Sequence, residues 1–127
     1  WTEVINLAKN LGFTECFGGR RYKIHKWGHK DSWISESSAI NFPIQGAGAS
    51  MKEIAIAVAT EKIPEALFSL DLHDAGFFYA PLGELKEIYN ETLNCLNEID
   101  YSGFWGFSPP IDLPYDGGIG VNFSEVK

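Results

Sequence analysis

The chain has 127 residues, of which 45% are hydrophobic and 14% aromatic, and it carries a formal net charge of -7 with a pI near 4.8. This composition excludes a disordered chain, and the length is typical of a single folded domain. The acidic balance excludes a protein whose whole surface binds nucleic acid, because neutralising phosphates requires a basic patch.

The first predicted elements are a helix and a hairpin. Apolar residues recur at helical spacing over 2–11, and Gly12 follows where a left-handed cap would end the helix. Strand-like runs at 13–17 and 21–24 flank a glycine pair, which suits a tight turn. Because the chain starts inside a helical pattern without Met, we expect a fragment of a longer reading frame.

A dense basic cluster begins in this hairpin. Arg20 and Arg21 could bind phosphates by charge beside the exposed glycine amides, although a solvated basic hairpin is equally ordinary. Any contact with nucleic acid must come from this cluster, whose members are Arg20, Arg21, Lys23, His25, Lys26, His29 and Lys30.

The longest predicted element is a helix over 35–63, which Pro43 should kink or divide because proline lacks an amide donor. Asn41 and Gln45 are four residues apart and therefore share one face of this helix. Their amides could reach base or sugar edges, with small residues nearby allowing a close approach. The alternative is that the small residues pack tightly against another element.

Two strand-like runs, 66–72 and 76–80, predict an antiparallel pair with a tight turn between them. Asp74 in that turn could be a rigidly held carboxylate, which is the kind of ligand that Mg²⁺ prefers. The alternative is that Asp74 simply stabilises the turn. His73 could be a base, a metal ligand or a hydrogen-bonding partner of a substrate. Asp71, two residues before His73 on the same strand face, could join this site or lie at a solvated edge, and we expect the edge.

The remaining predicted elements complete an α+β fold with a small antiparallel sheet and helices packed on one face. Pro81 begins an amphipathic helix over 82–99, and the Gly- and Pro-rich end of the chain predicts loops with one strand near 111–115. We interpret residues 1–127 as a single domain.

Cys16 and Cys95 belong to no metal-binding or redox spacing, which predicts a reduced, cytoplasmic setting. No apolar run approaches the roughly 20 residues that span a bilayer, and no secretory signal opens the chain. We therefore expect no membrane insertion.

Four segments in order resemble the C-terminal part of the family A (Pol I-like) DNA polymerases of bacteria and phages. Residues 13–22 resemble the family's hairpin with Gly-Arg-Arg-x-Tyr, and residues 36–49 resemble its helix with Asn-x-Pro-x-Gln-Gly. Residues 72–75 resemble its Val-His-Asp-Glu turn, and residues 118–123 its Gly-x-Gly-x-Asn-Trp ending. The match covers nearly the whole chain and identifies it as part of a catalytic palm.

The resemblance implies a role for each candidate residue. Asp74 would hold the two catalytic Mg²⁺ ions, and His73 would lie near the primer terminus. The contacts with primer-template DNA would come from Arg20 and Arg21 at the backbone and from Asn41 and Gln45 in the minor groove.

Two residues depart from the family pattern: Ala75 replaces a carboxylate and Ser37 replaces an arginine. The upstream fingers and the rest of the palm, with the second metal-binding aspartate and the groups that hold the dNTP, are absent. Two Mg²⁺ ions about 4 Å apart need more than one carboxylate. We therefore expect no activity without the upstream polypeptide, and self-association through the apolar surface that its absence exposes.

Two alternatives remain open from the sequence. One is an HD-type metal phosphohydrolase, in which His25 or His29, the pair His73 and Asp74, and Asp112 would be ligands carried on helices. The other is a non-catalytic DNA-binding or docking module derived from a polymerase, which the missing motifs and Ala75 favour.

Overall fold

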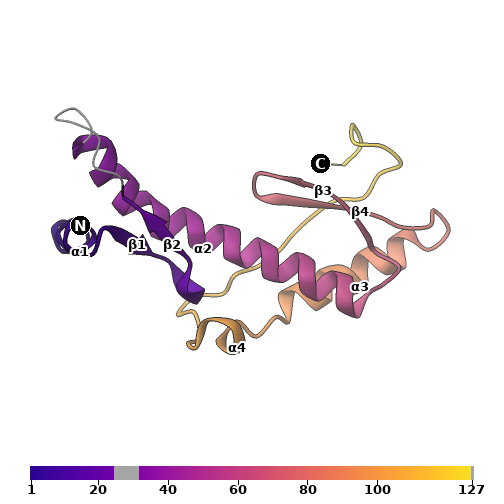
Figure 1. Cartoon of the computed structure of the whole chain (residues 1–127). Coiled ribbons are helices and arrows are strands. Elements are labelled where there is room, and N and C mark those ends of the chain that lie inside the picture. Colours follow the sequence, from indigo (N-terminus) through magenta and orange to yellow (C-terminus); the bar gives the residue numbers. More distant parts are fainter. Residues whose placement is uncertain (25–31, 127) are drawn as a thin grey trace. The chain divides into compact units, whose positions relative to one another are not determined.

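The structure is a computed structural model that describes residues 1–24 and 32–126, without the side chains of residues 32–35. Its elements confirm the predicted α+β class, with the strands forming two separate two-stranded antiparallel sheets instead of one (Figure 1). The chain divides into two compact units, Trp1–Met51 and Lys52–Lys127.

The first unit begins as predicted. Helix α1 (Thr2–Leu11) ends at Gly12, whose φ of 76° is left-handed. Strand β1 (Phe13–Glu15) pairs antiparallel with β2 (Arg21–Lys23).

The turn of this hairpin contains the short 3-10 helix η1 (Phe17–Gly19). Gly18 and Gly19 have φ values of 79° and 81°, a conformation that side chains with a Cβ disfavour. The glycine pair therefore makes the turn possible.

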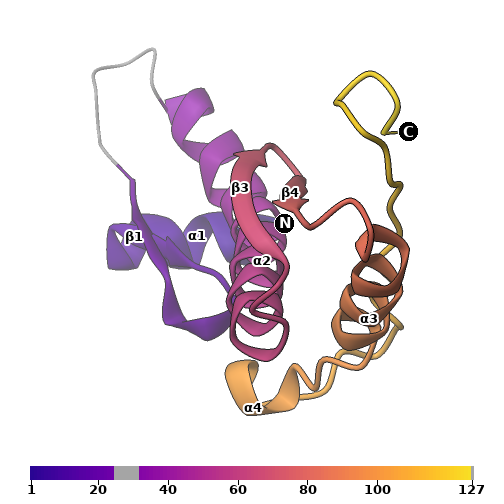
Figure 2. The same ribbon diagram turned by 90° about the vertical axis from the view of Figure 1, so that its right-hand side faces the viewer.

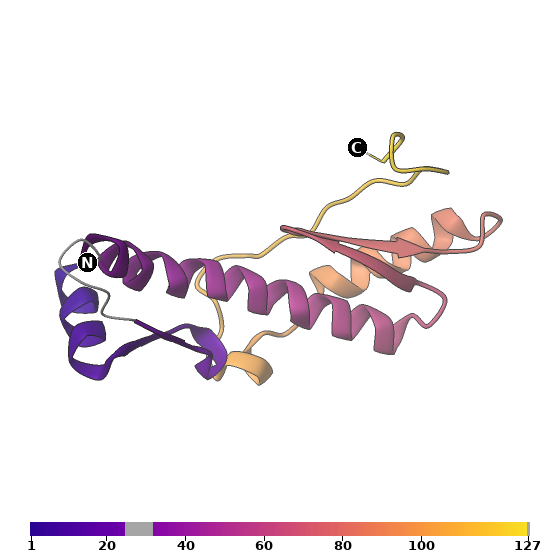
Figure 3. The same cartoon turned by 45° about the horizontal axis from the view of Figure 1, so that its top comes forward.

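Helix α2 (Ser32–Lys62) runs through Pro43 as one helix (Figure 3), so of the predicted kink or division at Pro43, the division is wrong. Proline cannot donate to the carbonyl four residues earlier, which here belongs to Ala39. The hydroxyl of Thr14 on β1 donates to that oxygen at 3.3 Å, within a buried contact. A side chain from the hairpin thus supplies the donor that the helix lacks.

The β1–β2 hairpin packs closely on the first part of α2. A Cβ at Gly46 would lie 2.8 Å from Cys16 Sγ, so only glycine fits there. The rings of Tyr22 and Phe42 stack with centroids 5.0 Å apart. The small residues of α2 therefore serve tight packing at Gly46, whereas Gly48 has open space around it.

In the second unit, β3 (Leu67–Leu72) and β4 (Ala75–Tyr79) form the predicted hairpin. Phe68 pairs with Phe78 and Leu70 with Phe77, so the residue between Phe68 and Leu70 has no partner and forms a bulge.

The core of this unit lies between the end of α2, β4 and α3 (Leu85–Asn97). Its buried members are Ile63, Ala66 and Ile88, with Phe78, Ala80 and Cys95 packed against them. Helix α3 is shorter than the predicted 82–99, because residues 82–84 form a turn before it.

The predicted strand at 111–115 is wrong, because these residues form no strand. Figure 2 shows the C-terminal segment, in yellow, running past α3. The Asn97 amide donates to the Tyr115 carbonyl at 3.1 Å, and its oxygen accepts the Tyr115 N–H at 2.7 Å. Tyr89 Oη donates to the Gly117 carbonyl at 2.8 Å. Side chains of α3 thus bond to the backbone of the C-terminal segment at Tyr115 and Gly117.

A short helix that the sequence did not predict, α4 (Ser102–Trp105), lies between α3 and the C-terminal segment. Asp100 accepts the N–H of Ser102 at 2.9 Å at its start.

Across 1–24 and 32–126, none of the helices combines the length and apolarity needed to cross a bilayer.

Candidate functional site

Asp74 lies at the tip of the β3–β4 hairpin. His73 and Asp74 form the two-residue turn, with Leu72 and Ala75 paired across it. Within the described part of the chain, the exposed Asp74 side chain makes no hydrogen bond or ion pair, so its carboxylate faces solvent. The turn thus presents a carboxylate in the geometry that the sequence predicted.

The backbone of this turn is strained at His73, where φ is 53°. A left-handed conformation costs a residue with a Cβ roughly 1–2 kcal/mol, and such positions persist where the surrounding structure holds them. His73 itself is exposed.

Lys52 on α2 contacts the same turn. Its Nζ donates to Asp71 Oδ1 at 2.5 Å and to the His73 carbonyl at 2.6 Å. Only 19% of the Lys52 side chain is exposed, whereas 46% of Asp71 is. Sequence reasoning missed Lys52, because a single lysine in a long helix reads as part of its solvated face. It also placed Asp71 at an open edge, where the structure gives it an ion pair.

The turn does not by itself provide a site for two metal ions. Nowhere in the ranges that the structure describes do three or more His, Cys, Asp or Glu residues gather as metal ligands would. Asp71 is paired with Lys52, and Ala75 has no carboxylate. Asp74 is therefore the open carboxylate of this turn, and a two-ion site would need further ligands.

The two amides predicted to face DNA lie in the first unit. Asn41 and Gln45 lie on α2, where a spacing of four residues puts them on one face, and both are exposed. Asn41 Nδ2 donates to Ser37 Oγ at 3.2 Å. Ser37, which stands where the resembled family has arginine, therefore orders the neighbouring amide instead of adding a charge.

The basic hairpin also lies in the first unit. Arg21 Nε donates to Glu15 Oε2 at 2.6 Å, and its guanidinium lies over the Phe13 ring, 4.6 Å from the centroid. Arg20 and Lys23 are exposed. The other predicted members of the basic cluster fall outside the described residues: His25, Lys26, His29 and Lys30.

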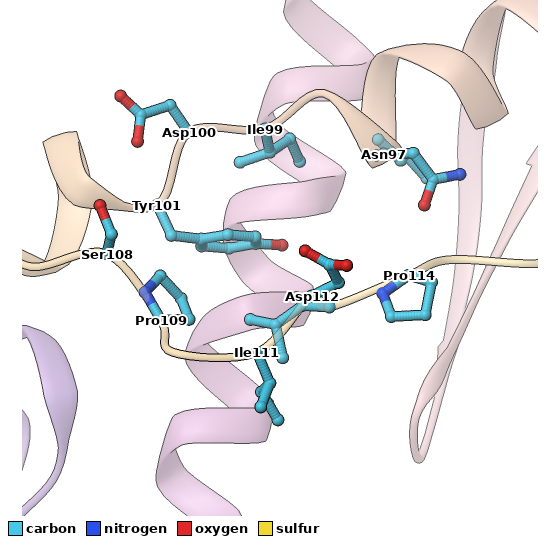
Figure 4. Close-up of a pocket in the computed structure, with 11 residues that line it drawn as sticks. Asn97, Ile99, Asp100, Tyr101, Ser108, Pro109, Ile111, Asp112 and Pro114 are labelled. Atoms are coloured by element: carbon cyan, nitrogen blue, oxygen red, sulfur yellow. The ribbon is translucent and has the colours of Figure 1, made fainter.

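A pocket of about 280 Å³ lies elsewhere in the second unit, and it includes Asp112 in its lining. Figure 4 shows the Tyr101 ring in this pocket and the Asp100 carboxylate directed away from the ring. The hydroxyl and the N–H of Ser102 hold the pKa of Asp100 below its usual value. Burial raises the pKa of Tyr101 and of Tyr115, whose hydroxyls lie 2.5 Å apart.

The phosphohydrolase alternative is wrong, because the structure lacks the helical placement of His73 and Asp74 that this class requires. That class carries its histidine and aspartate ligands on helices, whereas His73 and Asp74 lie in a turn between two strands. Its other proposed histidines, His25 and His29, are outside the described residues.

The fold has a counterpart among solved structures. The POL domain of Pol1 from M. smegmatis, in complex with DNA primer-template and dNTP, matches with a TM-score of 0.66 at 23% identity. The match covers 76% of this chain and 18% of that one. The fold is therefore that of part of a polymerase domain.

The sequences of two curated relatives identify the family within this class. DNA polymerase I of Lactococcus lactis subsp. cremoris (strain MG1363) is 32% identical over 92 residues, which is 67% of this chain. DNA polymerase I of Mycobacterium leprae (strain TN) is 25% identical over 96% of it. The chain belongs to the DNA polymerase I family, the family A polymerases, which confirms the resemblance.

The chain spans 10% of the Lactococcus protein and 13% of the Mycobacterium leprae protein. No protein-family model matches it.

Proposed function

We propose that this chain is the C-terminal part of the catalytic palm of a DNA-directed DNA polymerase, which extends a primer 3′ hydroxyl with dNTPs. The observation that carries the proposal is the open carboxylate of Asp74 at a hairpin tip, in a chain of this family. Because one carboxylate cannot offset two divalent ions, we expect polymerisation to require the upstream polypeptide.

In the complete enzyme, Asp74 would be one oxygen ligand of Mg²⁺, which would supply charge neutralisation at the transferring phosphoryl group. The remaining ligands would come from the upstream polypeptide. This chain would hold the Asp74 carboxylate at a fixed position. A tight turn between two paired strands does this better than a long loop.

The DNA contacts would come from residues of the first unit. Asn41 and Gln45 present amides that can bond to base edges in the minor groove, where acceptors are common to all base pairs. Arg20 and Arg21 would contact the phosphate backbone, and His73 would lie near the primer terminus. We also propose a cytoplasmic setting, which the two free cysteines support because reduced thiols are usual there.

Replacing Asp74 tests the proposal directly. In a complete polymerase carrying this segment, Asp74→Ala should lower nucleotide incorporation at least about a hundredfold, because a group that stabilises charge in the transition state is lost. Binding of primer-template DNA, followed by fluorescence anisotropy, should change less than twofold, since binding rests on other contacts.

The matched control is Asp116→Ala, which removes an exposed carboxylate from the C-terminal segment. It should leave both incorporation and DNA binding near the wild-type values. Primer extension by Asp74→Ala at a rate close to wild type would contradict the proposed role.

A second candidate function is a non-catalytic DNA-binding or docking module. The observations that favour it are Ala75 in place of a carboxylate and the ion pair that occupies Asp71. Mixing the chain with the upstream polymerase polypeptide separates the two functions, because restored primer extension requires a catalytic part, whereas a docking module leaves the mixture inactive.

A further inference from the structure

Lys52 joins α2 to the tip of the β3–β4 hairpin. Its ammonium donates at once to the Asp71 carboxylate, at 2.5 Å, and to the His73 carbonyl, at 2.6 Å. Exposed ion pairs usually contribute little, since water screens them and two long side chains must be ordered. Lys52 differs because its side chain is only 19% exposed and it bonds to two acceptors of one hairpin.

The bonded carbonyl has a specific position. The His73 carbonyl belongs to the peptide group that joins His73 to Asp74, and this group is planar. Fixing its oxygen therefore fixes the orientation of the plane from which the Asp74 side chain emerges. The same peptide group follows His73, whose φ of 53° is the positive value that two-residue hairpin turns adopt at a cost for a residue with a Cβ.

Helix α2 supports the hairpin one turn further along. Ile56, four residues after Lys52 and so on the same helix face, approaches Gly76, where a Cβ would lie 3.6 Å from Ile56 Cγ1. Gly76 is the register partner of Asp71 on the opposite strand. The helix thus contacts both strands next to the turn, with a charged contact on β3 and an apolar one on β4.

We propose that Lys52 is a positioning residue for Asp74: by bonding to Asp71 and to the His73 carbonyl, it sets the direction of the catalytic carboxylate. This role rests on the proposed function, although the order that Lys52 gives to the turn does not. Lys52 also neutralises Asp71 and leaves Asp74 as the open carboxylate of the tip.

The first experiment measures the turn in the full chain by amide hydrogen exchange. Lys52→Met keeps the apolar stem and removes the ammonium, and it should speed exchange at Leu72 and Ala75 about tenfold, as expected for losing charge-assisted hydrogen bonds. Lys62→Met is the matched control, because it removes a lysine from the exposed last turn of the same helix. It should change exchange at these amides less than twofold.

Two further variants keep the test decisive if Lys52→Met fails to fold. Lys52→Arg retains donors and charge and should preserve most of the protection. Asp71→Asn retains an acceptor but removes the ion pair, and it should speed exchange about threefold. Exchange that is unchanged in both Lys52→Met and Asp71→Asn would overturn the proposal.

The second experiment measures steady-state primer extension by the complete polymerase carrying this segment. Lys52→Met should lower kcat about tenfold while KM for dNTP changes less than twofold, and Lys52→Arg should restore most of kcat. A loosened turn with unchanged kcat would overturn the positioning role. If the wild-type enzyme does not extend primers, the proposed function fails, and hydrogen exchange alone decides whether Lys52 orders the turn.

Discussion

At the scale of single residues, a charged group on α2 and a strained backbone determine how the candidate carboxylate is presented. Asp74 is open to solvent, while its neighbour His73 has a φ of 53° and a carbonyl bonded to Lys52. Two-residue hairpin turns favour a positive φ at their first central residue, so the turn itself accounts for the sign of this angle. The bond from Lys52 adds a tertiary contact to the same peptide group from a residue more than twenty positions earlier in the chain.

The tyrosine pair near the C-terminal segment gives a prediction of pH dependence. Burial raises the pKa of both Tyr101 and Tyr115, so the folded state favours the neutral phenols. Their stabilising contribution is complete below the unfolded pKa of about 10 and is lost as the pH rises through the folded values. The free energy of unfolding in urea should therefore fall between about pH 9 and about pH 12.

Tyr115→Phe should flatten this loss of stability, because only one phenol of the pair can then ionise. Tyr79→Phe is the control, since that side chain is 59% exposed, and it should leave the pH dependence unchanged. Identical pH profiles for wild type and Tyr115→Phe would count against the explanation.

The sequence predicted where the candidate site residues lie in the fold, but it did not predict the hydrogen bonds that Lys52 makes to the turn. Asp74, His73, Asn41 and Gln45 lie in the turn and on the helix face that local pattern predicts. Lys52 could not be found in this way, because no local rule connects a lysine in one element with a carbonyl in another. The sequence shows only that Lys52 and Ile56 are four residues apart and therefore share one face of the helix.

At the scale of elements, α2 shows how a tertiary contact overrides a local rule. Proline inside a helix leaves one carbonyl without its donor, which predicted a kink or a division of the helix at Pro43. The buried hydroxyl of Thr14 bonds to that carbonyl, at Ala39, so the helix continues. The sequence contained both residues but not their proximity, which depends on how the first hairpin packs.

This compensation can be measured as a coupling between two positions. Thr14→Val removes the donor and should destabilise the chain by about 1–3 kcal/mol, because the buried carbonyl of Ala39 loses its partner. In a Pro43→Ala background the helix supplies its own N–H, so the same substitution should cost about 1 kcal/mol less. Urea unfolding of the four proteins gives both values.

Thr60→Val is a suitable control for the loss of a threonine hydroxyl. Its hydroxyl donates to the Ile56 carbonyl at 2.8 Å on an exposed part of α2, where water can replace it. We expect a change within about 0.5 kcal/mol. Equal costs of Thr14→Val in both backgrounds would show that the hydroxyl does not serve Pro43.

The predicted strand at 111–115 failed for a related reason. The sequence predicted one strand near 111–115, but at Tyr115 the backbone is bonded by the Asn97 side chain of α3 and not by a strand. An amide side chain offers N–H donors and a carbonyl acceptor, the same kinds of group that a neighbouring residue in a sheet would offer. Periodicity alone cannot separate these two cases.

At the scale of the whole molecule, the chain has a sparse core for its length. The side chains that are buried among the described residues are mainly small, and no large one in that set is below 2% exposed. Many large apolar side chains are instead exposed, including Leu67, Leu70 and Leu72 on β3. This is expected of a segment that spans 10–13% of its relatives, because much of its apolar surface would meet the rest of the enzyme.

The chain alone should therefore self-associate. Light scattering should show a mass that rises with protein concentration, because contact between exposed apolar surfaces removes them from water. Leu67→Lys should reduce this association, since the side chain is 62% exposed on β3, whereas the exposed Ser124→Lys should not. A constant monomer mass up to high concentration would contradict the prediction.

The bulge in β3 determines which face of the strand the residues next to the hairpin tip occupy. Successive side chains of a strand alternate between its faces, and one extra residue reverses that alternation from there onward. The unpaired position is Ser69, between the core contact at Ala66 and the bond from Asp71 to Lys52. Deleting Ser69 would restore a regular alternation and turn Asp71 to the opposite face of the strand. The number of residues in β3 therefore determines whether Asp71 faces Lys52.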